Sequence, residues 1–245
     1  MIVELARPGS GNALSNALVT ELTAAVGAAP AAGIRALVLA GAGRHFCTGA
    51  DLAELAATVD APEEERLADA ARLGALYAAL LRCPLLTVAA VHGAAFGGGM
   101  GLAAACDLVI AGENARIQFS EARLGFVPAL ISVFLPRRVP PARLVRLFVD
   151  PEPIGPEAAR DAGLVDEITP DPRAAAQRRA AEVCRKVAAS AVAETKRLLL
   201  DLTLPDLDAR LSMAARANAR QRANPECREG LAAFLTDRTF PGWAD

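Results

Sequence analysis

Three stretches of the chain are apolar over most of their length and rich in branched aliphatic residues, a pattern typical of buried strands. They are IRALVLAGAG (34–43), PLLTVAAVHG (84–93) and CDLVIAG (106–112). Because polar residues do not alternate with the apolar ones, these strands indicate a parallel sheet that is covered on both faces. Helical stretches alternate with them, so the sequence predicts an α/β fold with right-handed crossover connections.

The predicted helices have apolar residues at helical spacing and recognisable start signals. Ser15 is a candidate N-cap for a helix over 15–29, and Pro62 with several acidic residues opens a helix over 61–83. After about residue 170 the chain becomes Arg-rich, amphipathic and free of strand patterns. We therefore expect a ligand-binding core over residues 1–185 and a helical module over 186–245 that covers the core or a partner subunit.

Composition and charge exclude several classes of protein. The 245 residues contain 26 Lys and Arg against 28 Asp and Glu, so no strongly basic face for nucleic acid is expected. No apolar stretch approaches the roughly 20 residues of a membrane span, and the N-terminus lacks a signal-peptide pattern. The 5 cysteines are scattered without a C-x-x-C pair and only 2 histidines are present. These counts favour reduced thiols in a cytoplasmic protein without a metal site.

Three consecutive glycines, Gly97–Gly99, follow the second predicted strand and precede a helix expected from Met100 to Cys106. Backbone N–H groups at a helix N-terminus lack intrahelical partners, and glycine lets a ligand approach them closely. The sequence has neither the Lys and Ser/Thr of a P-loop nor a complete G-x-G-x-x-G. Taken alone, the triplet favours tight packing over a binding site.

A second glycine turn, in GRHFCTGADL (43–52), follows the first predicted strand and places Gly49 before another expected helix. Two such turns at the ends of strands of one parallel sheet could direct two N–H groups at one point. Two converging N–H groups are what an oxyanion requires, so the pair of turns favours an oxyanion hole.

These residues carry a resemblance to the crotonase (enoyl-CoA hydratase/isomerase) superfamily that covers nearly the whole chain. The matching segments are RPGSGNALSNAL (7–18), HFCTGADLAEL (45–55), VHGAAFGGGMGLAAACDLVIAGENARIQFSEARLGFVP (91–128), EAARDAGLVDEI (157–168) and REGLAAFLTDRTFPGW (228–243). The resemblance implies a crotonase-type ββα spiral core with a C-terminal helical module. It also implies an acyl-CoA substrate, no separate cofactor, and a homotrimer or homohexamer.

By the same resemblance, the N–H groups of Ala50 and Gly98 form the oxyanion hole for the thioester oxygen. Gly97 and Gly99 would support that turn. The residues expected to contact the substrate are Gly49, Asp51, Leu52, Gly97, Gly101 and Pro128. Asp51 and Asp107 are expected to cap or orient loops, and His45 and His92 to make structural hydrogen bonds.

Family hydratases carry two glutamates, and only one is present here. The first position is Gly101, which cannot transfer a proton, and the second is Glu121. Phe119 and the apolar run after Leu124 would raise the pKa of Glu121, as suits general acid–base catalysis. The alternative is a surface carboxylate that pairs with Arg123 or Arg116.

One glutamate is compatible with hydration, with double-bond isomerisation and with decarboxylation, and a non-catalytic acyl-CoA binder stays open. Hydration is the reaction we favour. The sequence ALIS (129–132) after Pro128, together with Gly101, resembles single-glutamate members that act on methylglutaconyl-CoA or carboxygeranoyl-CoA. We therefore expect open space at Gly101 that the carboxylate of such a substrate could fill.

Overall fold

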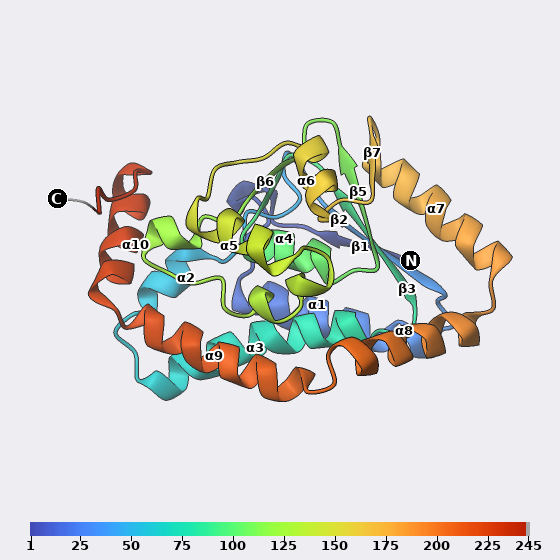
Figure 1. Cartoon of the computed structure of the whole chain (residues 1–245), viewed down its shortest axis with the longest axis horizontal. Helices are drawn as coiled ribbons and strands as arrows, with labels where there is room; N and C mark the ends of the chain where they lie inside the picture. Colours follow the sequence, from blue (N-terminus) through green and yellow to red (C-terminus); the bar gives the residue numbers. More distant parts are fainter. Residues whose placement is uncertain (244–245) are drawn as a thin grey trace.

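A five-stranded parallel sheet in the order β1-β2-β3-β5-β7 organises the chain. The computed structural model describes residues 1–243 (Figure 1). The strands are β1 (Ile2–Leu5), β2 (Ala36–Gly41), β3 (Leu86–Val91), β4 (Ala94–Phe96), β5 (Leu108–Gly112), β6 (Arg116–Gln118) and β7 (Glu167–Thr169). Strands β4 and β6 pair separately as a two-stranded parallel sheet. The three strands predicted from the sequence are the three central strands of the larger sheet.

Ten α-helices surround the sheets within residues 1–243. They are α1 (Asn16–Ala28), α2 (Leu52–Ala57), α3 (Glu63–Arg82), α4 (Gly98–Ala104), α5 (Pro141–Val149), α6 (Pro156–Ala162), α7 (Pro172–Lys186), α8 (Ala189–Thr203), α9 (Leu207–Arg222) and α10 (Pro225–Asp237). Ser15 caps α1 as predicted, because its side chain accepts a hydrogen bond from Leu18 N. The helix expected at Met100 begins two residues earlier, at Gly98.

Alternate residues of the central strands face opposite layers, so the sheet is buried on both sides. Val38 and Val88 pack with Ala176 of α7, whereas Leu39 and Val91 belong to the main core with α1, α3 and α4. This arrangement confirms the predicted double cover. The helix α9 runs along α3, and α10 lies beside α2 (Figure 1). The last two helices therefore pack against α3 and α2, and α2 follows the turn at Gly49.

None of the helices within residues 1–243 combines the length and apolar character needed to cross a membrane.

Candidate active site

The glycine triplet lies where β4 ends and α4 begins. Gly97 has φ 47 and ψ −121, a backbone conformation that strongly favours glycine. A Cβ atom on Gly97 would lie 2.8 Å from Oε1 of Glu121, and one on Gly99 would lie 2.3 Å from the carbonyl oxygen of Cys47. The absence of a side chain at Gly97 therefore lets the Glu121 carboxylate lie against the backbone, and its absence at Gly99 lets the loop at Cys47 do the same.

The second glycine turn lies against the first. Cys47 N donates to Ala94 O (3.1 Å), and Phe96 N donates back to Cys47 O (3.0 Å), which joins the two loops. Gly49 has φ 96, and a Cβ atom there would lie 3.7 Å from Gly98 N. The peptide bond after Gly49 carries the Ala50 N–H, so the two candidate oxyanion donors lie close together in space.

Both candidate donors are free of protein acceptors within residues 1–243. Gly98 N–H lies at the start of α4, where the helix supplies no carbonyl to it. The backbone groups on either side of the Ala50 N–H are hydrogen-bonded to Leu14. Leu14 N donates to Gly49 O (2.8 Å), and Asp51 N donates to Leu14 O (3.3 Å). These bonds fix the backbone around Ala50 while its own N–H remains available to a ligand.

Glu121 begins the short 3₁₀ helix Glu121–Leu124, and the residue as a whole is half-buried. Its Oε2 atom has no hydrogen-bond partner within residues 1–243 and essentially no solvent exposure. Burial disfavours the charged form and raises the pKa of Glu121 to about 7. The direction of this shift agrees with the prediction, and the sequence neighbours Phe119 and Leu124 are both buried.

The alternative ion pairs of Glu121 are not formed. Arg123 pairs with Glu152 and lies over the ring of Phe240, 5.2 Å from its centroid. Arg116 is exposed and makes no ion pair with Glu121 in the described part of the chain. The interpretation of Glu121 as a surface ion-pair partner is therefore wrong.

The position of the missing second glutamate is filled. A Cβ atom on Gly101 would lie 2.3 Å from Cγ2 of Ile131 and 3.2 Å from the hydroxyl of Tyr77. The expected open space at Gly101 is therefore absent, because the 3₁₀ helix Ile131–Val133 packs against α4 at this point. The explanation of substrate preference through space at Gly101 is wrong.

Tyr77 on α3 is a site residue that the sequence analysis did not identify. Its hydroxyl donates to Gly98 O at 3.0 Å, and the side chain is fully buried. Burial raises the pKa of Tyr77 well above its usual value, so the hydroxyl keeps its proton. It is the only tyrosine in the chain, but its position in an apolar helical stretch gave no sign of a role beyond packing.

Of the other expected substrate contacts, only Asp51 lines the cavity of about 60 Å³ beside Ala50. Asp51 also caps α2 through Glu54 N and pairs with Arg7 at 3.1 Å, so it orients the loop as predicted. Leu52 packs beside Ala50 and Leu55. Pro128 is not among the residues that line this cavity, although its neighbours Phe126 and Leu130 are.

The remaining polar residues have structural partners. Asp107 accepts from Thr87 N and pairs with Lys196 at 2.7 Å, which ties β5 to β3 and α8. His45 Nδ1 accepts from Ala94 N (3.2 Å), and His92 Nε2 lies 3.0 Å from Gly43 O. Within residues 1–243, no three or more His, Cys, Asp or Glu side chains are grouped as metal ligands would be.

Comparison with known proteins agrees with this geometry. The family model described as "Enoyl-CoA hydratase/isomerase" matches residues 1–245. A Rhodobacter capsulatus protein named "Probable enoyl-CoA hydratase" is 39% identical over 250 residues, which cover 97% of this chain and 91% of the relative. A crystal structure of an enoyl-CoA hydratase from Mycobacterium avium is 31% identical and has a TM-score of 0.85, with 99% of this chain and 93% of that chain covered.

An enoyl-CoA hydratase structure from Bacillus halodurans has a TM-score of 0.88 at 25% identity, with 95% of each chain covered. The expected crotonase-type fold is thereby confirmed. The sequence match spans the whole chain, and the structural match includes the parallel sheet and the C-terminal helices. The chain belongs to the enoyl-CoA hydratase/isomerase family of the crotonase superfamily.

Proposed function

We propose that this protein binds an acyl-CoA thioester and stabilises its enolate in an oxyanion hole formed by Ala50 N–H and Gly98 N–H. Both donors are rigid backbone groups without protein acceptors in the described chain, and the two turns that carry them are hydrogen-bonded together. Such donors stabilise the negative charge that develops on the thioester oxygen as a Cα–H bond breaks or forms. Coenzyme A enters as part of the substrate, and the proposed reaction requires no separate cofactor.

Glu121 is the proposed proton-transferring group, and its geometry is the observation that carries the proposal. The carboxylate contacts Gly97, the residue before the oxyanion donor Gly98, and its Oε2 atom has no hydrogen-bond partner in the described part of the chain. A pKa of about 7 allows the carboxyl group to give and take a proton near neutral pH.

Hydration is the first candidate reaction. In it, water adds across the Cα=Cβ bond of an enoyl-CoA, and Glu121 takes a proton from the attacking water and delivers one to Cα. Isomerisation is the second candidate, in which Glu121 removes a proton from Cα and returns it to Cγ. The packing of Ile131 and Tyr77 against Gly101 favours isomerisation, because it leaves no place at Gly101 for a second group to hold the water.

Mass-spectrometric product analysis distinguishes these reactions. The purified protein is incubated with 2-enoyl-CoA and 3-enoyl-CoA substrates that carry straight, branched and carboxylated acyl groups. Addition of one water indicates hydration, an unchanged mass with a moved double bond indicates isomerisation, and loss of carbon dioxide indicates decarboxylation. Gly98→Pro removes one oxyanion donor and should nearly abolish turnover in a folded protein. Binding without any turnover across the panel would contradict the proposal and favour a non-catalytic acyl-CoA binder.

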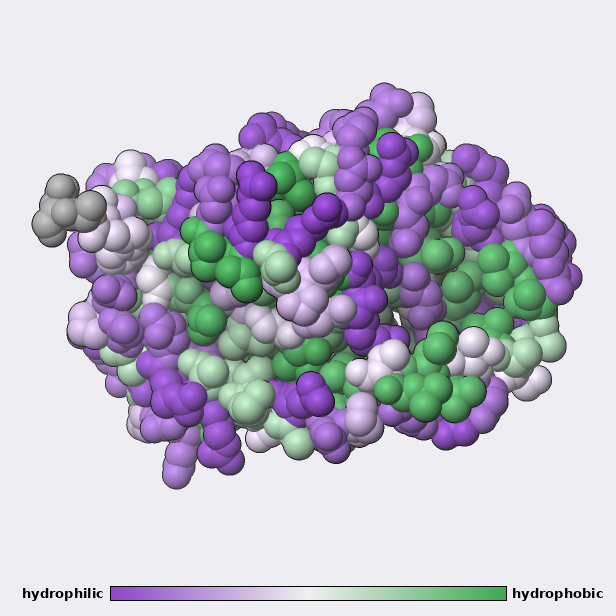
Figure 2. All heavy atoms as spheres, in the orientation of Figure 1, coloured by the Kyte–Doolittle hydropathy of each residue, from purple (hydrophilic) through white to green (hydrophobic). Residues whose placement is uncertain are grey.

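We also propose a homotrimer or homohexamer in which the module over 186–245 contributes to the subunit contacts. Leu198, Leu199 and Leu202 of α8 and Met213 of α9 are at least half exposed, and hydrophobic residues gather over the α8 region at the lower right of Figure 2. Large exposed apolar patches are typical of interaction surfaces. A groove of about 1430 Å³ between α8, α9 and the 130–138 segment lies beside them.

A further inference from the structure

The hydroxyl of Tyr77 lies against the turn that carries the candidate oxyanion donor Gly98. It donates to Gly98 O at 3.0 Å. A Cβ atom on Gly98 would lie 3.1 Å from this hydroxyl, and one on Gly101 would lie 3.2 Å from it. Within residues 1–243, no other side chain forms a hydrogen bond with the backbone of Gly97–Gly99. The hydroxyl therefore supports the turn beside the position where family hydratases carry their first glutamate.

Glycine residues make this turn flexible by themselves, so bonds from neighbouring groups must fix its shape. On one side of the donor, Gly97 N donates to Gln118 O (2.7 Å) and Gly97 O accepts from Gly101 N (3.0 Å). On the other side, the bond from Tyr77 holds Gly98 O. The Gly98 N–H therefore lies between two backbone bonds and one side-chain bond, and only the side-chain bond can be removed by a substitution that leaves the backbone intact.

Tyr77 is itself held in one orientation. Its side chain is fully buried, and its ring lies 5.2 Å from the ring of Phe134, centroid to centroid. Burial raises the pKa of Tyr77 well above its usual value, so the hydroxyl keeps its one proton. Because this proton is donated to Gly98 O, the hydroxyl orients the turn and does not protonate a substrate.

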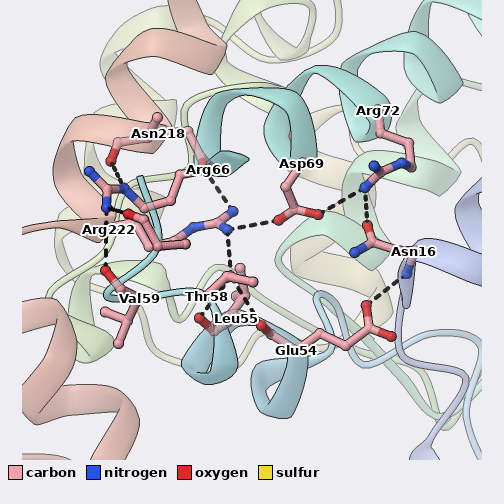
Figure 3. A network of polar contacts seen from close by, with 12 residues as sticks. Asn16, Glu54, Leu55, Thr58, Val59, Arg66, Asp69, Arg72, Asn218 and Arg222 are labelled. Atoms are coloured by element: carbon pink, nitrogen blue, oxygen red, sulfur yellow. Dashed lines mark hydrogen bonds and ion pairs between the residues drawn. The ribbon is translucent and has the colours of Figure 1, made fainter. Parts of the chain in front are cut away.

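The helix α3, which carries Tyr77, is connected to α2 through a polar network (Figure 3). Arg72 of α3 donates to Asn16 Oδ1 at 2.6 Å, and Asn16 N donates to Glu54 Oε2 of α2 at 2.8 Å. The helix α2 follows directly after the loop that carries Ala50, the other candidate donor. The helix α3 is therefore bonded to the segments on both sides of the oxyanion hole, to α4 through Tyr77 and to α2 through Arg72.

A second connection joins α3 to α9 and to the end of α2. Arg222 of α9 is buried, and its Nη1 donates to Asp69 of α3 (2.8 Å) and to Thr58 Oγ1 (3.2 Å), as Figure 3 shows. Separating a buried ion pair leaves a buried charge without its partner, which is strongly unfavourable. The tyrosine hydroxyl is therefore presented by a helix whose position is fixed.

We propose that Tyr77 is a positioning residue of the oxyanion hole: its hydroxyl holds Gly98 so that the Gly98 N–H and the Ala50 N–H meet at one thioester oxygen. Donors that are fixed in advance stabilise a developing charge well, because they need not reorganise during the reaction. Gly101 belongs to the same arrangement, since a side chain there would press on the hydroxyl. This inference rests on the proposed oxyanion function and assigns one of its parts.

A 3-oxoacyl-CoA measures enolate stabilisation at equilibrium, without turnover. Acetoacetyl-CoA loses a C2 proton to give a conjugated enolate that absorbs in the near ultraviolet, and an oxyanion hole favours this ionisation. Spectra over a pH series give the ionisation constant of the bound ligand. Glu121→Gln serves as the parent protein, because it lacks both the charge and the proton transfer of Glu121.

Tyr77→Phe in this parent removes the hydroxyl and keeps the ring. Since the loosened turn no longer holds one of the two donors in place, we expect the ionisation constant of bound acetoacetyl-CoA to fall about ten-fold. Butanoyl-CoA, which forms no enolate under these conditions, should bind both proteins equally well. A purely structural role of the tyrosine would not produce this difference between the two ligands.

Thr87→Val in the same parent is the matched control. Thr87 is also buried, and its hydroxyl donates to Asp107 Oδ2 (3.0 Å) and accepts from Asp107 N (3.0 Å), away from the glycine triplet. It should leave the ionisation constant unchanged although a buried hydroxyl is lost. A fall of the same size in Thr87→Val would assign the effect to lost stability and overturn the inference.

The parent protein separates the two proposals. If it binds butanoyl-CoA and favours the enolate of acetoacetyl-CoA, but Tyr77→Phe leaves the ionisation constant unchanged, the inference about Tyr77 fails while the proposed function stands. If the parent binds neither ligand, or binds both without favouring the enolate, the proposed oxyanion function itself fails, and the inference fails with it.

Discussion

Glu121 combines two properties that oppose each other in a folded protein. Its Oε2 atom is buried without a hydrogen-bond partner among residues 1–243, which suits proton transfer but disfavours the ionised form. The apolar residues around it in the sequence were enough to predict a raised pKa. Tyr77 could not be identified in the same way, because its hydrogen bond is made to Gly98, which lies 21 residues away in the sequence.

The raised pKa of Glu121 predicts a specific pH dependence of stability. The folded pKa of about 7 exceeds the ordinary value of 4.5, so between these pH values the folded state holds a proton that the unfolded state has lost. The free energy of unfolding should therefore fall as pH rises through this window and then level off. Glu121→Gln removes this term, so its stability relative to wild type should increase with pH.

Urea denaturation of both proteins at about pH 5 and about pH 8 measures this difference. A stability difference between wild type and Glu121→Gln that is the same at both pH values would contradict the assigned pKa.

At the scale of elements, the two glycine turns show what the sequence pattern could predict. Apolar runs located the central strands, and the glycines located the turns that follow them. The three-residue strands β4, β6 and β7 are too short for a periodic pattern, and their pairing depends on tertiary contacts. The filled space at Gly101 was equally hidden, because Ile131 reaches α4 from a segment 30 residues away.

The contact between α4 and the 3₁₀ helix Ile131–Val133 predicts a coupled pair of substitutions. Gly101→Ala would place a methyl group 2.3 Å from Ile131 Cγ2 and should destabilise the protein by about 1–3 kcal/mol. Ile131→Ala should cost about 2–5 kcal/mol through the cavity it leaves. In the double variant the new methyl group enters that cavity, so the total cost should be smaller than the sum.

Chemical denaturation of the four proteins gives the coupling energy directly. Costs that add within experimental error would mean that Ile131 does not press on Gly101 in solution.

At the scale of the whole molecule, the C-terminal helices connect the site to the surface. The helix α9 carries Arg222 and Asn218 to the cavity on one side, while Met213 on the same helix is exposed on the other. The sequence predicted these helices from their amphipathic pattern, and the structure divides the stretch 171–202 into α7 and α8. Which surface each helix presents could not be predicted, because alanine-rich helices have weakly defined apolar faces.

The exposed apolar residues of α8 and α9 predict assembly in solution. Light scattering should give the mass of a trimer or hexamer for the wild type. Leu202 is 70% exposed and Met213 66% exposed, so Leu202→Asp and Met213→Asp should leave the fold intact but lower the assembly mass. A monomeric wild type at micromolar concentration would contradict the proposed contacts.

Exchange of the Cα protons of a 3-enoyl-CoA with solvent deuterium tests the central claim most directly. Exchange requires only that Ala50 and Gly98 stabilise the enolate and that Glu121 removes the proton, whichever reaction follows. We expect mass spectrometry to show deuterium at Cα with the wild type, and a rate at least ~100-fold lower with Glu121→Gln. Wild-type exchange no faster than in buffer, or an unchanged rate in Glu121→Gln, would contradict the account.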